Sequence, residues 1–288
     1  MLRVELIANA HAGRGRGRAA AEAAQRVLVS AGCQVRVQMP TTAEATREFA
    51  GQASLHADVV AAVGGDGTLR TVLDGLQRPV SAAVIPIGTA NVVARELKIP
   101  LDPEGAAAVI AAGHTQPFDL GDANGRHFLA MTGVGLDAEI IDALHTTRVG
   151  PIRKSDYLAP TWRALTEPAR PRLRLTVDGA PFASTLQDII VCNVRNYAAY
   201  FAVAPNAIAN DGRLDWVARP PAGAWSSLRW AWAAIRKRPL ASLEYGTALQ
   251  LTIEALGDPV AVQIDGDPAG TTPLAVRILP AAARLCVP

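Results

Sequence analysis

The segment of this chain best suited to chemistry is a glycine-rich run, Gly64-Gly65-Asp66-Gly67-Thr68. It directly follows the apolar segment DVVAAV and precedes the helical pattern TLRTVLDGL. Glycines at a strand-to-helix turn let the backbone approach a phosphate closely, and the N–H groups at the start of a helix favour negative charge. The run therefore predicts a binding site for a phosphate-bearing ligand.

Asp66 needs a separate explanation, because a carboxylate repels a phosphate. It could bind a Mg²⁺ ion that the phosphates also bind, or it could accept a proton from an attacking hydroxyl. A third alternative is that Asp66 is a helix cap in an ordinary turn. The residue type and its position leave these roles open.

A second candidate loop follows the next apolar segment, SAAVIPI, and contains Gly88, Thr89, Ala90 and Asn91. If the two segments are strands of neighbouring βα units, their loops lie on the same carboxyl edge of the sheet, where open α/β folds bind ligands. Thr89 and Asn91 are then candidates to bind phosphate, ribose or base. Alone, this loop would be an ordinary turn and helix cap.

The elements that position these loops follow from the pattern of the chain. Up to about residue 113, short apolar runs alternate with Ala-rich stretches, which is typical of βα units and a mostly parallel sheet. The predicted strands are 4–9, 33–39, 58–63 and 81–87, and the predicted helices are 18–31, 42–55, 67–77, 89–98 and 103–112. From Phe118 onward, β segments separated by turn residues dominate, with helices predicted only at about 136–146, 155–166 and 222–237.

Composition excludes several classes of protein. The chain has 288 residues, and 28 Lys and Arg against 26 Asp and Glu give a net charge of +2, which is not the broad basic field of a nucleic-acid binder. Half of the residues are hydrophobic, which excludes disorder. Three scattered cysteines indicate neither a disulfide framework nor a zinc knuckle, and the sequence has no signal-peptide pattern and no long apolar run. A cytoplasmic protein without a spanning helix is expected.

The order of several motifs resembles the diacylglycerol kinase catalytic-domain family, which includes bacterial lipid kinases, diacylglycerol kinases and sphingosine or ceramide kinases. The motifs are GGDGT at 64–68, PIGTANVVAREL at 86–97, FLAMTGVGLDAEI at 128–140, NDGRLD at 210–215 and QIDGD at 263–267. One departure is Val92, which stands where the family often has an Asp, so that one carboxylate of the usual network is missing.

The resemblance implies a fold of the class α/β plus all-β. A doubly wound, phosphofructokinase-like α/β domain is expected over 1–120, followed over 121–288 by a β-sandwich-like domain whose last strand could return to the first domain. The implied reaction is transfer of the γ-phosphoryl group of ATP to a lipid hydroxyl with Mg²⁺. The residues that it assigns to the nucleotide are Thr41, Gly64, Gly65, Asp66, Gly67, Thr68, Leu69, Arg70, Thr89 and Asn91, with Thr42 as an alternative to Thr41.

The resemblance also assigns roles in the second half of the chain. The general base is expected at Asp265, with Asp66 as the alternative, although Asp265-Gly266 without the resemblance is a strong hairpin-turn signal. A structural Mg²⁺ is expected at Asp211 together with the carbonyls of Ile208 and Arg213, against the alternative of a surface turn. Asp137 is expected to contact the lipid headgroup, or else to cap the helix 136–146.

The implied partner is a lipid substrate at a membrane surface, with no nucleic acid. Trp225, Trp230 and Trp232 lie among basic residues on the predicted helix 222–237, which could rest on an anionic bilayer at the inner face of the membrane or pack in the core. The oligomeric state stays open, a homodimer included. The rival functions are an NAD kinase, which also uses GGDGT, and a nucleotide- or lipid-binding protein without turnover.

Overall fold

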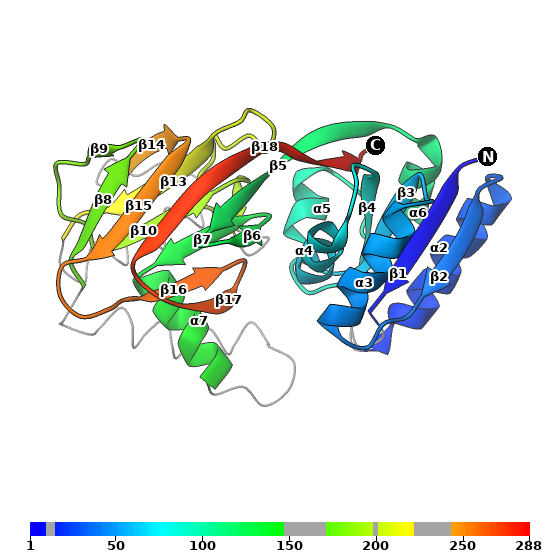
Figure 1. Ribbon diagram of the computed structural model, residues 1–288, viewed down its shortest axis with the longest axis horizontal. Helices are drawn as coiled ribbons and strands as arrows, with labels where there is room; N and C mark the ends of the chain where they lie inside the picture. The colour runs from blue at the N-terminus through cyan, green and yellow to red at the C-terminus, as the bar shows by residue number, and fades with distance from the viewer. Residues whose placement is uncertain (10–14, 147–170, 198–200, 222–242) are drawn as a thin grey trace. The chain divides into compact units, whose positions relative to one another are not determined.

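The computed structural model describes residues 1–9, 15–146, 171–197, 201–221 and 243–288 (Figure 1). These residues form two compact units: unit 1 comprises Met1–Asp119 and Ala281–Pro288, and unit 2 comprises Leu120–Pro280. The strands β5 (Thr115–Ala123) and β18 (Leu274–Cys286) contribute residues to both units. The predicted helices at 155–166 and 222–237, the second with its tryptophans, lie outside the described residues.

Unit 1 is built on a parallel sheet. Its strands are β1 (Arg3–Ala8), β2 (Gln34–Gln38), β3 (Val59–Gly64) and β4 (Ser81–Pro86), in the order β2-β1-β3-β4, and the end of β18 lies parallel to β4. Every residue of β3 is buried. Such uninterrupted apolar strands suit a sheet that is covered on both faces.

Helices cover both faces of this sheet. They are α2 (Gly17–Ser30), α3 (Ala43–Ser54), α4 (Asp66–Gly75), α5 (Val92–Glu96) and α6 (Pro103–Ala112). The strand order reverses direction after β2, so right-handed crossovers put α2 on one face and α3 and α4 on the other. Consistently, α2 packs against α6, and α3 packs against α4. The predicted doubly wound arrangement is confirmed.

One helix of unit 1 differs from its prediction. The pattern predicted a helix over 89–98, but α5 begins only at Val92, because Asn91 has a left-handed φ of 50° that interrupts a helix. Residues 88–91 therefore remain a loop next to the glycine-rich run.

Unit 2 contains two sheets. The first is antiparallel, in the order β14-β13-β10-β7-β16-β17, and the second contains β18, β15, β8, β9, β5 and β6. The strands of the first sheet are β7 (Met131–Val134), β10 (Asp188–Cys192), β13 (Leu214–Arg219), β14 (Glu244–Ala248), β16 (Ala261–Ile264) and β17 (Asp267–Thr271). The remaining strands are β6 (Arg126–Phe128), β8 (Leu173–Val177), β9 (Ala180–Pro181), β15 (Gln250–Ala255), and the separate pair β11 (Asn196–Tyr197) and β12 (Phe201–Ala202). The helix α7 (Leu136–Thr146) packs on β16 and β17.

The core of unit 2 lies between these two sheets. Buried side chains of the first sheet, such as Ile189 and Val262, and of the second, such as Leu175 and Ile253, form one apolar cluster. Along β15 buried and exposed residues alternate, as expected for a strand with one face on a core. The predicted β-sandwich-like fold is confirmed.

The strand β18 covers 13 residues. It passes from unit 2 to unit 1 at Ala281, where φ is 50° and the N–H group donates to Oδ1 of Asp119 at 2.7 Å. Within the described ranges, no helix combines the length and apolar character needed to cross a membrane.

Candidate active site

The glycine-rich run joins β3 to α4 and packs directly against the loop that follows β4. A side chain on Gly64 would collide with Thr68, which folds back over it, and a Cβ on Gly88 would lie 2.6 Å from the Cα of Gly65. Only glycine permits the two backbones to come so close. The structure thus brings the two predicted loops together at the carboxyl edge of the unit 1 sheet.

Asp66 links these two loops. Its Oδ2 accepts the N–H of Val92 at 2.9 Å, and its Oδ1 accepts the N–H of Val93 at 3.0 Å. Burial raises the pKa of Asp66, and the backbone N–H groups oppose that rise. Asp66 therefore caps the N-terminus of α5, although it belongs to α4.

Asn91 stabilises the second loop from within. Its side chain is buried, and its Nδ2 donates to the carbonyl of Gly88 at 3.0 Å. Its Oδ1 has no hydrogen-bond partner among the described residues and lies 2.8 Å from where a Cβ on Gly88 would be. Asn91 thus shapes the loop, while Thr89 in the same loop is exposed.

A hollow of about 130 Å³ lies at the carboxyl ends of the first strands of unit 1. Its lining residues are Asn9, Pro40, Thr41, Thr42, Ala43, Thr46, Gly67, Thr68 and Thr71. It brings together three residues that the sequence assigned to the nucleotide, namely Thr41, Gly67 and Thr68. Of the two competing threonines, Thr42 caps α3 by accepting the N–H of Ala45 at 3.1 Å, which favours Thr41 for a ligand.

The other seven residues assigned to the nucleotide do not line this hollow, namely Gly64, Gly65, Asp66, Leu69, Arg70, Thr89 and Asn91. Leu69 is fully buried, and its N–H donates to the carbonyl of Gly65 at 3.1 Å. Arg70 is half-buried on α4, and Thr89 and Asn91 lie in the loop after β4.

Thr46 and Thr71 were not predicted as site residues, but they complete a row of threonines on the wall of the hollow. Their spacing from Thr42 and Thr68, four and three residues, places each pair on one helix face and was the available signal. Both hydroxyls donate to helix carbonyls, Thr46 to that of Thr42 and Thr71 to that of Gly67, each at 2.8 Å.

In unit 2, Asp265 and Gly266 form the two-residue turn between β16 and β17, with φ values of 49° and 83°. The Oδ2 of Asp265 accepts the N–H of Leu129 at 2.9 Å. Its Oδ1 accepts the N–H groups of Ala130 and Met131 at 2.9 and 3.1 Å. The turn that the sequence predicts therefore also fixes a carboxylate in one orientation.

Asp137 lies in the first turn of α7 and is buried. Its Oδ2 accepts from Nε2 of Gln263 at 2.7 Å. The N–H of Leu136 at the start of this helix is bound by Oδ1 of Asp188 at 2.6 Å. Asp188 in turn forms a buried ion pair with Arg219, and the sequence analysis assigned a role to neither residue.

The predicted metal-binding segment forms a tight turn. The N–H of Asp211 donates to the carbonyl of Ile208, and Oδ1 of Asp211 accepts the N–H of Arg213 at 3.0 Å. Burial and the negative charge of Asp211 raise the pKa of the nearby Asp215 to about 6. Neighbouring carboxylates and carbonyls are a donor set that fits a hard cation, although the described residues contain no cluster of three or more acidic, His or Cys side chains.

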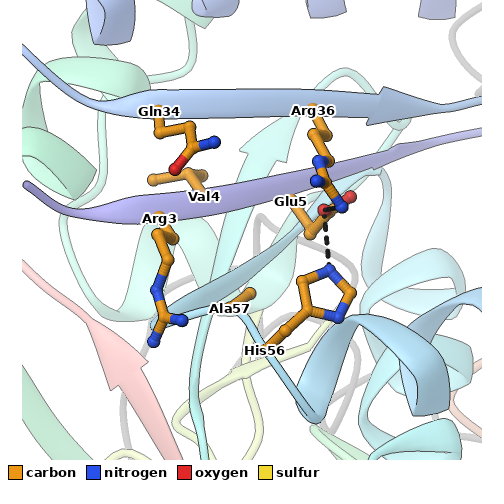
Figure 2. A pocket seen from close by; sticks show the side chains of 7 residues that line it. All are labelled: Arg3, Val4, Glu5, Gln34, Arg36, His56 and Ala57. Carbon is orange, nitrogen blue, oxygen red and sulfur yellow. Dashed lines mark hydrogen bonds and ion pairs between the residues drawn. The ribbon is translucent and has the colours of Figure 1, made fainter.

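A second hollow, of about 190 Å³, lies at the opposite, amino end of the unit 1 strands (Figure 2). Its polar centre is the buried carboxylate of Glu5, which binds Nε2 of His56 at 3.1 Å and lies 3.9 Å from the guanidinium of Arg36. Protein side chains thus already compensate the charge of Glu5. None of the predicted site residues lies there.

Comparison with known proteins decides the family. The model of the diacylglycerol kinase catalytic domain matches residues 3–123, and the model of the YegS C-terminal NAD kinase beta sandwich-like domain matches residues 130–287. The chain belongs to the diacylglycerol kinase catalytic-domain family. The two matched regions follow one another with a gap of only a few residues, so the two models together cover nearly the whole chain.

Curated relatives carry the name of this family. A diacylglycerol kinase of Bacillus subtilis (strain 168) is 26% identical over 281 residues, which cover 95% of this chain and 92% of the relative. A diacylglycerol kinase of Staphylococcus aureus (strain JH9) is 30% identical over 184 residues, which cover 60% of this chain and 58% of the relative. The chain is accordingly a lipid kinase of this family, with ATP as the phosphoryl donor.

Solved structures show the same fold. A diacylglycerol kinase from Bacillus anthracis str. Sterne matches with a TM-score of 0.76 at 22% identity, covering 99% of this chain and 97% of that one. An NAD kinase from Archaeoglobus fulgidus, in complex with ATP, reaches a TM-score of only 0.53 at 13% identity, covering 99% of this chain and 93% of that one. The NAD kinase is thus a distant relative in fold, while the family model and the curated relatives confirm the lipid kinase prediction.

Proposed function

We propose that this chain transfers the γ-phosphoryl group of ATP to a hydroxyl of a diacylglycerol-like lipid. The observation that carries this proposal is the pair of loops joined by Asp66, beside a threonine-lined hollow at the carboxyl edge of a doubly wound sheet. Open α/β sheets bind phosphorylated ligands at this edge. The diacylglycerol kinases among the relatives support the choice of acceptor.

The nucleotide is assigned to unit 1. Gly67 and Thr68 lie in the first turn of α4, a helix of 10 residues whose positive end favours phosphate oxygens. Thr41 adds a hydroxyl to the lining of the same hollow. Asp66 keeps the two loops in register by binding the start of α5, which makes it a positioning residue in this scheme.

The acceptor is assigned to unit 2, with Asp265 as the general base and Asp137 as the headgroup contact. The acceptor oxygen attacks the γ-phosphorus, the bond to the oxygen bridging the β- and γ-phosphorus breaks, and the hydroxyl proton passes to Asp265. Three backbone N–H groups donate to this carboxylate and fix its orientation. A strong base is not required, because the transition state of phosphoryl transfer is loose and depends chiefly on positioning.

Mg²⁺ has two assigned uses. With ATP it neutralises charge on the transferring phosphate, which is the chemistry that it supplies in this class of reaction. In unit 2, the carboxylate of Asp211 and the carbonyls of Ile208 and Arg213 would hold a structural ion. Asp215 supports this assignment, because burial and then the negative charge of Asp211 raise its pKa, and a cation would compensate that charge.

The experiment that tests the function is incubation of the purified protein with γ-labelled ATP, Mg²⁺ and a mixed lipid extract in vesicles, followed by thin-layer separation. We expect label in a phosphatidate-like product and none in NADP when NAD is supplied instead. Label in NADP alone would favour an NAD kinase. Nucleotide binding without any labelled product would favour a binding protein. Sedimentation with the vesicles would show whether the chain associates peripherally with a membrane.

A further inference from the structure

Gln263 is a buried polar residue to which the proposed mechanism gives no role. It is 1% exposed on β16, two residues before Asp265. Its strand neighbours Val262 and Ile264 belong to the core between the sheets, so strand alternation directs Gln263 to the opposite face. The helix α7 packs on this strand. A buried amide in such a place needs partners at both of its ends.

Both partners are residues of the proposed acceptor site. Nε2 of Gln263 donates to Oδ2 of Asp137 at 2.7 Å, and its Oε1 accepts the N–H of Gly266 at 2.8 Å. A carboxylate requires a donor and an N–H requires an acceptor, so the two partners fix which way the amide is oriented. One side chain thus connects the first turn of α7 to the turn that carries Asp265.

Gly133 makes room for this connection. It lies opposite Gln263 on β7. A side chain at this position would collide with the carboxylate of Asp137 and lie 3.1 Å from Nε2 of Gln263. The close approach of Asp137 and Gln263 therefore depends on a glycine within the strand.

The turn at Asp265 and the start of α7 are each also held by hydrogen bonds that do not involve Gln263. The carboxylate of Asp265 holds its turn to the backbone of residues 129–131. The start of α7 is held by Asp188, itself paired with the buried Arg219. Gln263 lies between these two anchored groups and spans the remaining distance from Asp137 to Gly266.

We infer that Gln263 is a positioning residue for phosphoryl transfer, which holds the headgroup contact Asp137 and the base-bearing turn at Asp265 in one fixed arrangement. The inference rests on the proposed function, because it presupposes that these two aspartates serve the acceptor. Loss of the link leaves both aspartates in place but lets their separation vary, and small displacements of reacting groups lower the rate strongly.

Two substitutions distinguish the hydrogen bond that Gln263 donates to Asp137 from the one that it accepts from Gly266. Gln263→Met keeps the length of the side chain and removes both hydrogen bonds. Gln263→Glu keeps an acceptor for Gly266 and, at a pH at which both carboxyl groups are ionised, sets a second carboxylate against Asp137, which breaks that end by repulsion of like charges. A matched control is Val262→Ala on the same strand, which removes buried methyl groups and lowers stability without touching the link.

The full chain and these three variants are compared by steady-state kinetics with diacylglycerol vesicles, by thermal unfolding and by amide hydrogen exchange followed by NMR. We expect kcat to fall at least about tenfold for both Gln263 variants, with the KM for ATP within about twofold of wild type. The Gly266 N–H should exchange rapidly in Gln263→Met and remain protected in Gln263→Glu. Val262→Ala should retain kcat at temperatures where it is folded.

The outcomes distinguish the positioning role of Gln263 from the proposed lipid kinase function. If the wild type phosphorylates lipid and Gln263→Met retains full kcat although Gly266 has lost protection, the positioning role is wrong and the lipid kinase assignment stands. An equal loss of kcat in Val262→Ala would attribute the effect to general stability and would also overturn the role. If the wild type phosphorylates no lipid, the proposed function fails and the inference fails with it.

Discussion

Two aspartates of unit 2 occupy the same kind of turn but have different surroundings. Asp178 and Asp265 both precede a glycine and both have a φ of 49°. Oδ1 of Asp178 accepts the N–H groups of Leu249 and Gln250 at 2.8 and 2.9 Å, and its side chain is 38% exposed. Asp265 instead holds the segment that leads into β7. The Asp-Gly dipeptide specifies the turn, and the surroundings of the carboxylate specify its further use.

This pair supplies a controlled test of the base. We expect Asp265→Asn to lower phosphoryl transfer at least about 100-fold, which corresponds to about 2.7 kcal/mol of transition-state stabilisation. Asp178→Asn removes the charge from an equivalent turn and should leave the rate near that of wild type. Turnover is measured with labelled ATP and lipid vesicles. Near-normal turnover in Asp265→Asn would remove this residue as the base.

Asp215 gives a pH-dependent prediction. Its pKa is raised from the usual 3.8 to about 6, so between these values the folded chain holds a proton that the unfolded chain has lost. Without metal, the free energy of unfolding should therefore fall as pH rises through this range and stay lower above it. In chelator at pH 8, Asp215→Asn should gain about 1 kcal/mol, a figure reduced for solvent screening because the group is half-exposed.

The measurement is denaturant unfolding of the wild type and Asp215→Asn at pH 8 and near pH 4, where the two proteins should differ little. Asp258→Asn is the control, since this exposed carboxylate lies in the same unit. An equal gain for Asp215→Asn at both pH values would contradict an effect of ionisation.

At the scale of elements, α5 is too short to be stable by itself. It has five residues, and helix nucleation is unfavourable at that length. Its first N–H groups are bound by Asp66 of α4, so the loop 88–91 depends on a carboxylate from a neighbouring element. The nucleotide loops therefore form one unit of structure rather than two separate turns.

From this dependence we expect Asp66→Asn to raise the KM for ATP about tenfold or more and to lower phosphoryl transfer at least about 100-fold. Asparagine offers one acceptor oxygen to Val92 and Val93, where aspartate offers two. Asp102→Asn is the matched control, because Asp102 caps α6 by accepting the N–H of Gly105 at 2.7 Å. Binding of ATP by Asp265→Asn should stay intact, and a matching loss there would contradict the division of roles.

The elements themselves were largely predictable, and the reasons are physical. The strands β3 and β4 are nearly uninterrupted apolar runs, because buried parallel strands must be apolar along their length. The predicted boundaries of β1 to β4 agree with the structure to within one residue. The late start of the helix that was predicted over 89–98 depends on the left-handed Asn91 and on Asp66, which is 25 residues away in sequence. No local pattern reports such a contact.

Contacts between residues far apart in sequence also limit how much of the site can be predicted. Gly64, Gly65 and Asp66 are prominent in the sequence because glycines and a carboxylate rarely meet at a strand end. Gln263 is not, because a single glutamine in a strand looks like a solvent-facing residue until α7 is known to cover it. Its partner Asp137 lies 126 residues away. Contacts across such distances follow from the topology of the sandwich and not from spacing.

At the scale of the whole molecule, each unit is assigned its own ligand. Unit 1 carries the hollow with Gly67 and Thr68, and unit 2 carries the turn at Asp211. The net charge of +2 leaves no general attraction for anions, so the ligands depend on these local groups. A ligand that binds only the folded chain stabilises it by mass action.

Mg²⁺ without nucleotide should therefore raise the thermal unfolding midpoint of the wild type through unit 2. At about 100 times its dissociation constant, a single bound ion adds about 2.7 kcal/mol to the free energy of unfolding. Asp211→Asn should lose this gain, whereas Asp258→Asn, which alters another exposed carboxylate of the same unit, should retain it. The gain should also require ionised Asp215 and so shrink below pH 6. A midpoint that rises equally in Asp211→Asn would place the ion elsewhere, because the carboxylate of Asp211 is the charged ligand of the assigned site.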